Sequence, residues 1–495
     1  MKFSMKRILA ALLAGLMLLP MAACGNATDD DTVTTDAVNQ TVAEEETRDP
    51  NFTCELPDDL NYGNAEINIM YGTSPGQEDE LYSERLGLGT VSDAVYERNL
   101  AVENRLGVKL VMVEGDSITS TLQTTVRAGD TSLDIYDMMS YEAIPLAISG
   151  HYLDLNRLNY VDTSKHYWVQ DYNDIVTFTE ENMQFLATSP AALTMFRLTY
   201  FTIFNNELMT ERRLPNLYDT VENGEWTLDY QYQLIADEYV DTDGNGQRSA
   251  GDYFGYVTGG FESLDGHLVA SGIRLAVRDE YGEWVFNSEK LESSADMVEK
   301  VCALNNAPGA YIETDGIGNY DIIDQFSREE GMMATTMFLA LEGRIEALAD
   351  VPYGIVPMPK LTREQPAYYY FVQDRVSSFG ISAAIGDEAR QDMLGATMEA
   401  IAYYSNEIVR PAYYDTTLSL RFMQDPRSRD MLDIMFETLS FDLGYYVGLG
   451  NVREDMRSIL DGKNPAVVSR FKAWEKSAAN TLKKYAKSLS KLTQD

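Results

Sequence analysis

A stretch near the middle of the chain carries oxygen-bearing side chains at alternate positions. It runs DTDGNGQRSAGD from residue 241 to residue 252, with Gly246 where a sharp turn is needed. Calcium-binding loops of this length place their ligands at such alternate positions, because the hard Ca²⁺ ion prefers oxygen atoms. The pattern predicts a structural Ca²⁺ site with these ligands: Asp241, Asp243, Asn245, Gln247 (through its backbone carbonyl), Ser249 and Asp252.

The alternative is a polar turn, rich in Gly, Asp and Asn, that binds no ion. Asp252 stands where such loops usually have glutamate, and its shorter side chain reaches less far toward the metal. In either case we expect the loop to take no part in binding a ligand, and we expect the protein to need no cofactor.

The three cysteines and three histidines show no metal-ligand spacing, and Cys54 and Cys302 either pair or remain as thiols.

The N-terminus has the composition of an export signal. Three positive charges precede the apolar run from Ile8 to Leu19, which is shorter than the roughly 20 residues that span a bilayer. The residues before Cys24 resemble the lipobox of bacterial lipoproteins, although Met21 stands where leucine is usual. The resemblance implies that Cys24 becomes the lipidated mature N-terminus, on the extracellular face of the cell membrane. The alternative is an ordinary signal peptide with an unmodified cysteine.

The chain is strongly acidic. It has 78 acidic and 39 basic residues and a net charge of −39. Such a surface argues against nucleic acid as a partner, because phosphate binding needs Lys and Arg. Residues 25–50 are especially rich in Asp, Glu and Thr and poor in aromatic residues, so we expect a flexible tether there.

Strands and helices alternate after residue 60. Ala65–Tyr71, Val108–Val113 and Leu133–Met139 read as strands separated by helices, which predicts a parallel sheet with crossover helices. A second series includes strand-like segments at Thr199–Asn205 and Gly331–Met337. The roughly 435 residues after residue 60 exceed what one hydrophobic core usually holds. We therefore predict an α/β protein of two lobes.

The C-terminal segment from Ser469 to Leu489 is predicted to be an amphipathic helix. Its apolar residues recur at spacings of three and four, and its polar face is basic, unlike the rest of the chain. We expect it to pack on an acidic lobe. The alternative is a helix that lies on a membrane or docks a partner.

Several segments, in this order, resemble family 1 of the bacterial extracellular solute-binding proteins, the maltodextrin-binding-like group. They are AGDTSLDIYDMMS from residue 128, GHYLDLN from 150, FTIFNNELM from 201, GEWTLDYQYQLI from 224, DTDGNGQRSAGDYFGY from 241 and YGIVPMPK from 353. The resemblance implies a periplasmic-binding-protein-like fold with a ligand cleft between the lobes. The lobes would be joined by crossing hinge strands near residues 172–178, 345–355 and 404–410.

The resemblance also implies a division of the chain and a function. The parts would be a signal peptide (1–23), the lipidated cysteine and acidic tether (24–60), lobe 1 (61–174), lobe 2 (175–350), a return to lobe 1 (351–405), and a return to lobe 2 with the C-terminal helices (406–495). We expect a monomer that captures a small polar ligand and delivers it to the permease subunits of an ABC importer. Sugars are the commonest cargo of this family.

Ligand contacts are expected in loops at the carboxyl ends of strands, where open α/β sheets bind ligands. Polar groups there would bond hydroxyls, and aromatic faces would cover the C–H surfaces of a sugar. The candidates are Tyr71, Thr73, Ser140, Tyr141, Glu142, Trp168, Tyr200, Thr336, Met337, Phe338, Tyr445 and Tyr446. Each could instead be a packing or surface residue.

Two other functions stay open at this point. A secreted glycoside hydrolase would need a placed pair of carboxylates, which a chain with so many acids could supply. No H-E-x-x-H motif occurs, and we expect no enzyme. A surface lipoprotein that docks long glycans on an open face, without feeding an importer, is the other alternative.

Overall fold

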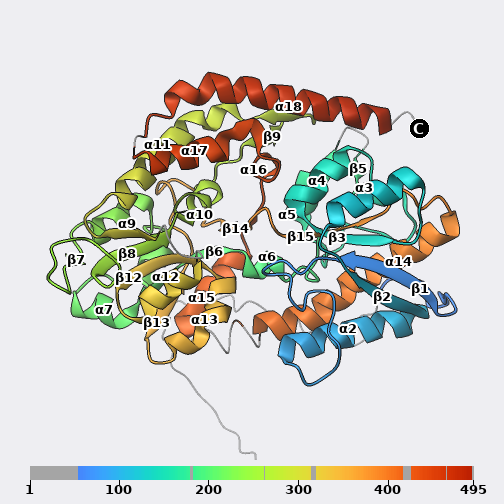
Figure 1. Ribbon diagram of the computed structural model, residues 1–495, viewed down its shortest axis with the longest axis horizontal. Helices are drawn as coiled ribbons and strands as arrows, with labels where there is room; N and C mark the ends of the chain where they lie inside the picture. The colour runs from blue at the N-terminus through green and yellow to red at the C-terminus, as the bar shows by residue number, and fades with distance from the viewer. Residues whose placement is uncertain are drawn as a thin grey trace, which may run out of the picture. The chain divides into compact units, whose positions relative to one another are not determined.

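The computed structural model describes residues 54–492 except 179–181, 261, 314–318, 416–417, 419–424 and 464. Figure 1 shows two main β-sheets within this part, each with its own helices. Cys24, the export signal and most of the predicted tether lie outside the described residues. Inside them, no helix combines the length and the apolar character that a membrane crossing requires.

The smaller sheet has four strands in the order β15-β3-β1-β2. Strands β1, β2 and β3 are parallel, and β15 runs antiparallel to β3. Helices α2 and α14 pack together beside it, and α3 and α4 contact β3. The prediction of an α/β lobe is confirmed. The bounds are β1 (Ala65–Tyr71), α2 (Thr90–Leu106), β2 (Val108–Glu114), α3 (Ile118–Ala128), β3 (Ile135–Met139), α4 (Ser140–Ile148), β15 (Ser377–Ile381) and α14 (Glu388–Tyr404).

Helix α2 shows how the sequence determines which side of a helix is buried and where the helix ends. Val95, Val102 and Leu106 are completely buried along one side of it. Gly107 follows in the left-handed conformation, with φ of 60°, and its N–H donates to the carbonyl of Glu103. A residue without a Cβ adopts this conformation without strain. Strand β2 begins at the next residue, so the glycine turns the chain directly from helix into strand.

The larger sheet has six strands, five of them in the order β11-β8-β12-β6-β13, with β7 paired to β8. Every residue of β12 and β8 is buried, as expected for strands covered on both faces. Strands β6 and β13 run antiparallel to their neighbours, so the start of β6 lies beside the end of β12. The bounds are β6 (Tyr200–Asn205), β7 (Tyr239–Val240), β8 (Tyr253–Gly259), β11 (Ala310–Glu313), β12 (Gly331–Met337) and β13 (Tyr353–Val356).

The remaining elements surround these sheets. The helices are α5 (Gln170–Val176), α6 (Thr194–Arg197), α7 (Asn206–Glu211), α8 (Leu217–Glu222), α9 (Leu228–Ile235), α10 (Glu262–Ala270), α11 (Leu291–Asn305), α12 (Asn319–Ser327), α13 (Phe338–Arg344), α15 (Pro426–Phe436), α16 (Leu443–Tyr446), α17 (Val452–Asp461) and α18 (Phe471–Leu492). Short strand pairs are β4 (Thr177–Phe178) with β5 (Met183–Gln184), β9 (Ala276–Arg278) with β10 (Trp284–Phe286), and β14 (Tyr370–Phe371) with β16 (Leu439–Ser440). Cys54 and Cys302 are buried free thiols.

The chain passes between the two sheets along segments that pair with each other. Ala187 bridges Phe379 of the smaller sheet, and Thr199, next to β6, bridges Val372. Residues 187–199 form the first crossing, and residues 372–377 form the second, antiparallel to it. A π-helical stretch, Ser405–Val409, follows α14 and begins the third crossing.

The first two crossings lie elsewhere than the sequence suggested. The segment 172–178 belongs to α5 and β4, and α5 is still bound to the smaller-sheet lobe through Tyr172, whose hydroxyl contacts Ser140. Strand β13, inside the predicted crossing 345–355, belongs to the larger sheet. The chain therefore re-enters the smaller sheet at Ser377, later than the predicted return at residue 351. The third crossing begins within the predicted segment 404–410.

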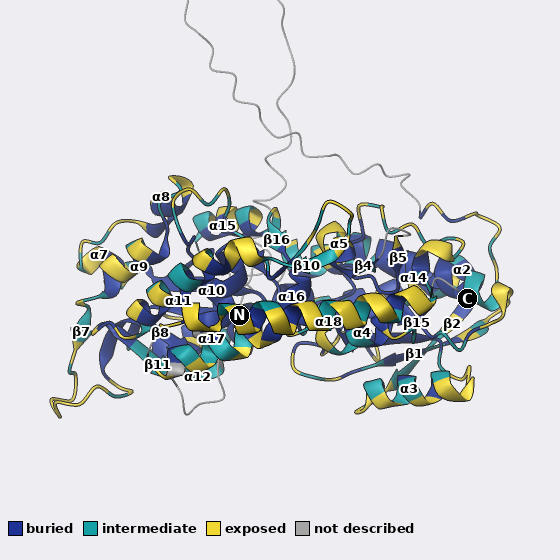
Figure 2. Ribbon diagram, turned by 90° about the horizontal axis from the view of Figure 1, so that it is seen from above, coloured by how far each residue is buried: buried dark blue, intermediate teal, exposed yellow. Residues whose placement is uncertain are grey.

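Helix α18 confirms the predicted C-terminal helix. It packs on β10 and on the turn Leu449–Asn451, and its far end reaches α4 of the smaller-sheet lobe. A Cβ on Gly150 would lie 2.6 Å from the side chain of Leu492, so the C-terminal end of α18 lies close to the residues that follow α4. Trp474, Ala478 and Leu489 of the apolar stripe are buried, and Figure 2 shows buried and exposed residues alternating along the helix.

A buried carboxylate joins the crossings. Glu80, 1% exposed, accepts hydrogen bonds from the backbone and hydroxyl of Thr194 in the first crossing and from Ser377 at the end of the second. Arg98, completely buried, donates to the Glu80 backbone carbonyl and to Ser405 at the start of the third. Burial raises the pKa of Glu80 and lowers the pKa of Arg98 to about 10. Hydrogen bonds from two buried charged residues, Glu80 and Arg98, thus reach all three crossings.

Replacing Glu80 with alanine should cost about 3–5 kcal/mol of unfolding free energy, because Thr194, Ser377 and Arg98 lose a buried anion. Urea denaturation monitored by circular dichroism measures this. Glu80→Gln keeps one oxygen acceptor and should recover part of the loss. Glu84→Ala, at an exposed neighbouring position, is the control and should change stability by less than about 0.5 kcal/mol. Equal stability of the Glu80→Ala and Glu84→Ala proteins would contradict the proposed role.

Candidate functional site

Residues from both lobes meet on the second crossing. The crossing segment, Phe371–Val376, runs between the start of β6 on one side and the end of β3 on the other. Tyr200, Tyr445 and Tyr446 reach it from the larger-sheet side, and Ser140 and Tyr141 reach it from the smaller-sheet side. The structure thus brings together these five of the twelve predicted ligand residues.

The larger-sheet side contributes an aromatic stack. The ring of Tyr200 lies parallel to Phe371, with centroids 6.1 Å apart, and Tyr445 meets Phe371 edge-on at 4.9 Å. Gln373 donates to the Tyr200 hydroxyl over 3.1 Å. The hydroxyl of Tyr446 donates to the carbonyl of Val372. These contacts fix the segment against the larger-sheet lobe.

Charged groups surround the same tyrosine. The Tyr445 hydroxyl donates to Asp265 over 2.7 Å, and Arg457 donates to the other oxygen of that carboxylate over 3.0 Å. The guanidinium of Arg453 lies 4.6 Å from the Tyr445 ring centre and donates to Asp374 over 2.5 Å. Burial raises the pKa of Asp374, and Arg453 counteracts that rise. The site therefore holds paired charges beside aromatic rings.

The smaller-sheet side is attached through the start of α4. Ser140 donates from its backbone and its hydroxyl to the carbonyl of Val376, and the Tyr141 backbone donates to the carbonyl of Asp374. Tyr141 is 39% exposed, and its hydroxyl donates to the half-buried Glu142. Burial raises the pKa of Tyr141, and Glu142 raises it further. A flat aromatic face and a carboxylate are thus available beside the segment.

Arg197 of α6 connects the two lobes directly. It donates to the carbonyls of Gly76 and Glu78, in the loop after β1, and its Nε lies 3.2 Å from Glu342 of α13. Gly76 has φ of 98°, and a Cβ there would press against Leu198 of the first crossing. The loop after β1 therefore approaches the crossing closely.

The other predicted ligand residues lie in different surroundings. Tyr71 is half-buried and Thr73 is exposed in the loop after β1. Thr336 and Phe338 are completely buried, because β12 continues directly into α13 and Phe338 stacks on Phe201 with centroids 4.3 Å apart. Met337, between them, is 7% exposed. The role of each as a ligand contact stays a prediction.

Trp168 lies apart from the crossing segment, beside a hollow of about 260 Å³. The indole N–H of Trp168 and the hydroxyl of Tyr167 both donate to Glu399 of α14, so neither faces the hollow as a free donor. Side chains on the other walls include Phe196, Gln170, Asn406 and Arg410. This hollow is a further place where a small ligand could bind.

The predicted calcium loop lies between β7 and β8. The carboxylates of Asp241, Asp243 and Asp252 come within 4.8 Å of one another. Backbone N–H groups of Gly244 and Gly246 donate to Asp241, and both glycines have positive φ, as a tight loop requires. Ser249 donates its backbone N–H to Asp252, and Gln247 donates its own to Asn245. The donor set is all oxygen, which fits a hard cation.

Comparison with known proteins finds this architecture elsewhere. No protein-family model and no curated protein matches the sequence. Among solved structures, the maltose/maltodextrin-binding domain MalE from Bdellovibrio bacteriovorus, bound to maltotriose, superposes with a TM-score of 0.53 at 13% identity over 85% of this chain and 100% of its own. A sugar transporter from Rhizobium etli in an open conformation gives 0.54 at 12% identity, covering 83% and 99%. An ABC transporter solute-binding protein from Thermotoga lettingae, bound with α-D-tagatose, gives 0.50 at 14%, covering 85% and 100%.

These superpositions extend over nearly the whole of each solved structure and over both sheets of this chain. The chain has the fold of the extracellular solute-binding proteins. The predicted two-lobe α/β fold with crossing segments is thereby confirmed. Tyr141 of α4 and Tyr445 of α16 both contact the segment Phe371–Val376.

Some residues of the site were not predicted. Asp265, Asp374, Arg453 and Arg457 form its ion pairs, but the partners lie far apart in the sequence. Gly444 was a local sequence signal that the chain packs closely beside Tyr445. It lies against Leu275, where a Cβ would not fit. Asp265 of α10 and Arg457 of α17 are distant in the sequence, so no periodic pattern of residues predicts their ion pair.

Tyr445→Phe should lower the unfolding free energy by about 1.5–3 kcal/mol, because a buried hydrogen bond to a charged acceptor is lost while the ring stays in place. Thermal and urea denaturation measure the change. Tyr281→Phe, at a 66% exposed position, is the matched control and should be neutral. An unchanged stability of the Tyr445→Phe protein would show that Asp265 does not depend on this hydroxyl.

Proposed function

We propose that this protein is a solute-binding protein of family 1 that captures a small polar ligand, a carbohydrate, between its lobes. The observation that carries the proposal is the meeting of residues from both lobes on the segment Phe371–Val376, beside which the ring of Tyr141 is exposed while Tyr200 and Tyr445 are buried. Two of the structural neighbours named above contain bound sugars, maltotriose and tagatose. Rings such as Tyr141, with a carboxylate beside it, suit the C–H faces and hydroxyls of a sugar.

Capture and release would follow from movement about the crossings. Lobe closure buries a ligand and is favoured only by contacts that the ligand makes better in the closed form. Tyr141 and Glu142 are attached to the segment on one side, and Tyr200 and Tyr445 on the other. A ligand that contacts Tyr141 and Glu142 together with groups of the other lobe would therefore bind the closed arrangement more tightly. The bound compound leaves unchanged, so the protein is not an enzyme.

The delivery step is part of the same proposal. The charged start, the apolar run and Cys24 support export and lipid attachment on the outer face of the cell membrane. A tethered monomer in that position would present its closed form to the permease subunits of an ABC importer.

Ca²⁺ at the loop Asp241–Asp252 is proposed as a structural ion. The convergent carboxylates and the alternate spacing support it. Asp241, Asp243 and Asp252 would hold the ion with Asn245, Ser249 and the carbonyl of Gln247. The loop lies at one end of β8, and the ion would stabilise that end of the larger sheet.

Binding of oligosaccharides should raise the thermal midpoint of the purified protein and reduce its radius of gyration in X-ray scattering. Tyr141→Ala should weaken the tightest-binding sugar about tenfold, or 1.4 kcal/mol, because an exposed stacking face is removed. The matched control is Tyr281→Ala, which removes an exposed ring far from the crossings. Isothermal titration measures both.

Two outcomes would contradict the proposed site. If Gln170→Ala weakens binding and Tyr141→Ala does not, the ligand occupies the hollow beside Trp168 instead. If the sugar is converted to a product, detected by chromatography after incubation, the protein is a carbohydrate-active enzyme.

Ca²⁺ should stabilise the chelator-treated protein by about 2–3 kcal/mol at roughly 100 times its Kd. Asp241→Ala should abolish this dependence, because it removes the ligand at the first position of the loop. Differential scanning calorimetry with and without Ca²⁺ measures the effect. Asp116→Ala, at an exposed acid outside the loop, should retain it. If the unmodified protein has the same thermal midpoint with and without Ca²⁺, the loop does not hold a structural Ca²⁺ ion.

A further inference from the structure

Helix α18 is fixed to the protein by one side only. Trp474, Ala478 and Leu489 are buried on that side, and the indole N–H of Trp474 donates to Asp455 over 2.8 Å. The predicted packing of the helix on the protein is therefore present, and its apolar stripe is already covered.

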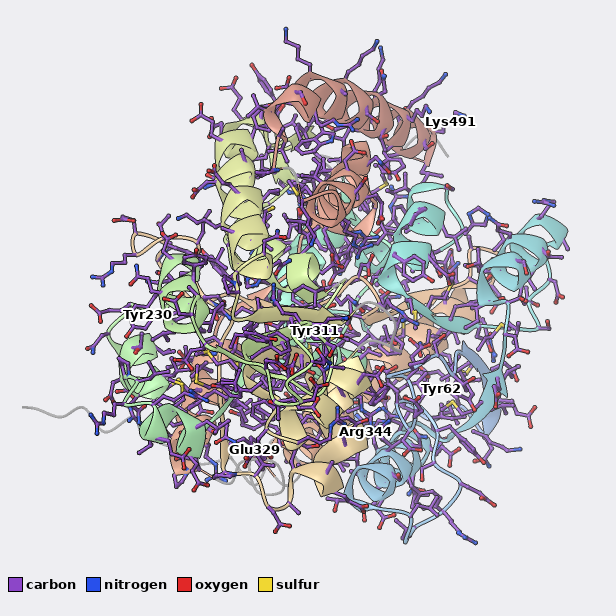
Figure 3. The ribbon with its side chains drawn as sticks, turned by 60° about the vertical axis from the view of Figure 1, so that its left-hand side comes forward. Tyr62, Tyr230, Tyr311, Glu329, Arg344 and Lys491 are labelled. Carbon is purple, nitrogen blue, oxygen red and sulfur yellow. The ribbon has the colours of Figure 1, made fainter. Side chains whose placement is uncertain are left out.

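The opposite side carries the strongest concentration of positive charge in the chain. Between residues 462 and 492 there is one acid, Glu475, and these bases: Lys463, Arg470, Lys472, Lys476, Lys483, Lys484, Lys487 and Lys491. All of these bases are exposed. Figure 3 shows side chains of α18 extending away from the protein, with Lys491 labelled near its end. The chain as a whole has twice as many acids as bases, so this segment is an exception.

These lysines have no acidic partners within the described part of the chain. None of the ion pairs found among residues 54–492 includes a base of α18. Instead, Lys472 and Lys476, Lys483 and Lys487, and Lys487 and Lys491 are four residues apart, a spacing at which like charges on a helix repel. An anionic partner would relieve that repulsion.

We propose that the outward face of α18, the basic face, binds the phosphate headgroups of an anionic lipid bilayer and orients the protein at the membrane surface. A straight row of cations matches a plane of anions. The exposed residues between the lysines are small or polar (Ala473, Ser477, Ala479, Asn480, Ala486 and Ser490), without the aromatic anchors typical of protein interfaces. Lipid headgroups therefore fit this face better than an acidic protein does.

The acidic remainder of the protein does not prevent such binding. Charges farther from the bilayer than about 8 Å are largely screened at physiological ionic strength. The electrostatic energy of binding therefore comes mainly from the face that touches the membrane, and each Lys close to an anionic surface adds to the attraction. The acidic surfaces would be repelled at short range, so the basic face selects one orientation out of many.

The test uses the unlipidated chain from residue 25 onward and sedimentation with vesicles. It should bind vesicles of phosphatidylcholine with phosphatidylglycerol, should not bind phosphatidylcholine alone, and should be released by high salt. Replacing four bases of the basic face with Gln should weaken binding at least tenfold: Lys476, Lys483, Lys484 and Lys487. The matched control replaces four exposed bases elsewhere and should bind as the unmodified chain does: Arg85, Arg127, Lys290 and Arg429.

Three results would overturn the proposal: no binding to anionic vesicles, equal binding to neutral vesicles, or equal loss in the two four-residue variants. The first would leave the basic face to an acidic protein partner. Circular dichroism of both variants checks that α18 remains folded. Sugar binding plays no part in this experiment, so its outcome is independent of the proposed transport function.

Discussion

Two buried charged residues, Glu80 and Arg98, hold together the part of the molecule on which everything else depends. Glu80 and Arg98 contact the first, second and third crossings through Thr194, Ser377 and Ser405. Charges removed from water this completely are costly unless their hydrogen bonds are satisfied. The pair therefore permits few alternative arrangements of the three segments.

The candidate site follows from this junction of the three crossings. The crossing segment Phe371–Val376 receives backbone hydrogen bonds from the start of α4 and aromatic contacts from β6 and α16. A ligand placed there would touch groups that belong to different rigid units. Binding energy could then be converted into closure, since the ligand would stabilise only the arrangement in which both units reach it. The ion pairs of Arg453 with Asp374 and of Arg457 with Asp265 hold the residues beside this segment in place.

Much of the fold could be predicted from the sequence, and the failures have physical causes. The end of α2 at Gly107 and the order of the first three strands follow from local patterns of burial and turn residues. The first crossing was missed because residues 187–199 are all buried and include several apolar residues, and so resemble core. Phe338 follows a strand, as a ligand residue would, but its ring fills a space above Phe201 that only the folded sheet creates. Asp265 and Arg457 could not be paired in advance, because nothing local relates residues so far apart.

The C-terminal helix has a mechanical consequence. Because α18 rests on the turn Leu449–Asn451 at one end and meets Gly150 through Leu492 at the other, it joins the lobes a fourth time, outside the junction. Opening the lobes must then release or slide that far end. If the protein binds a ligand between its lobes as proposed, ligand binding and attachment of the chain terminus would be thermodynamically linked, and each would change the other's affinity by the same factor. A fusion or truncation that loosens Leu492 would then alter the affinity for that ligand.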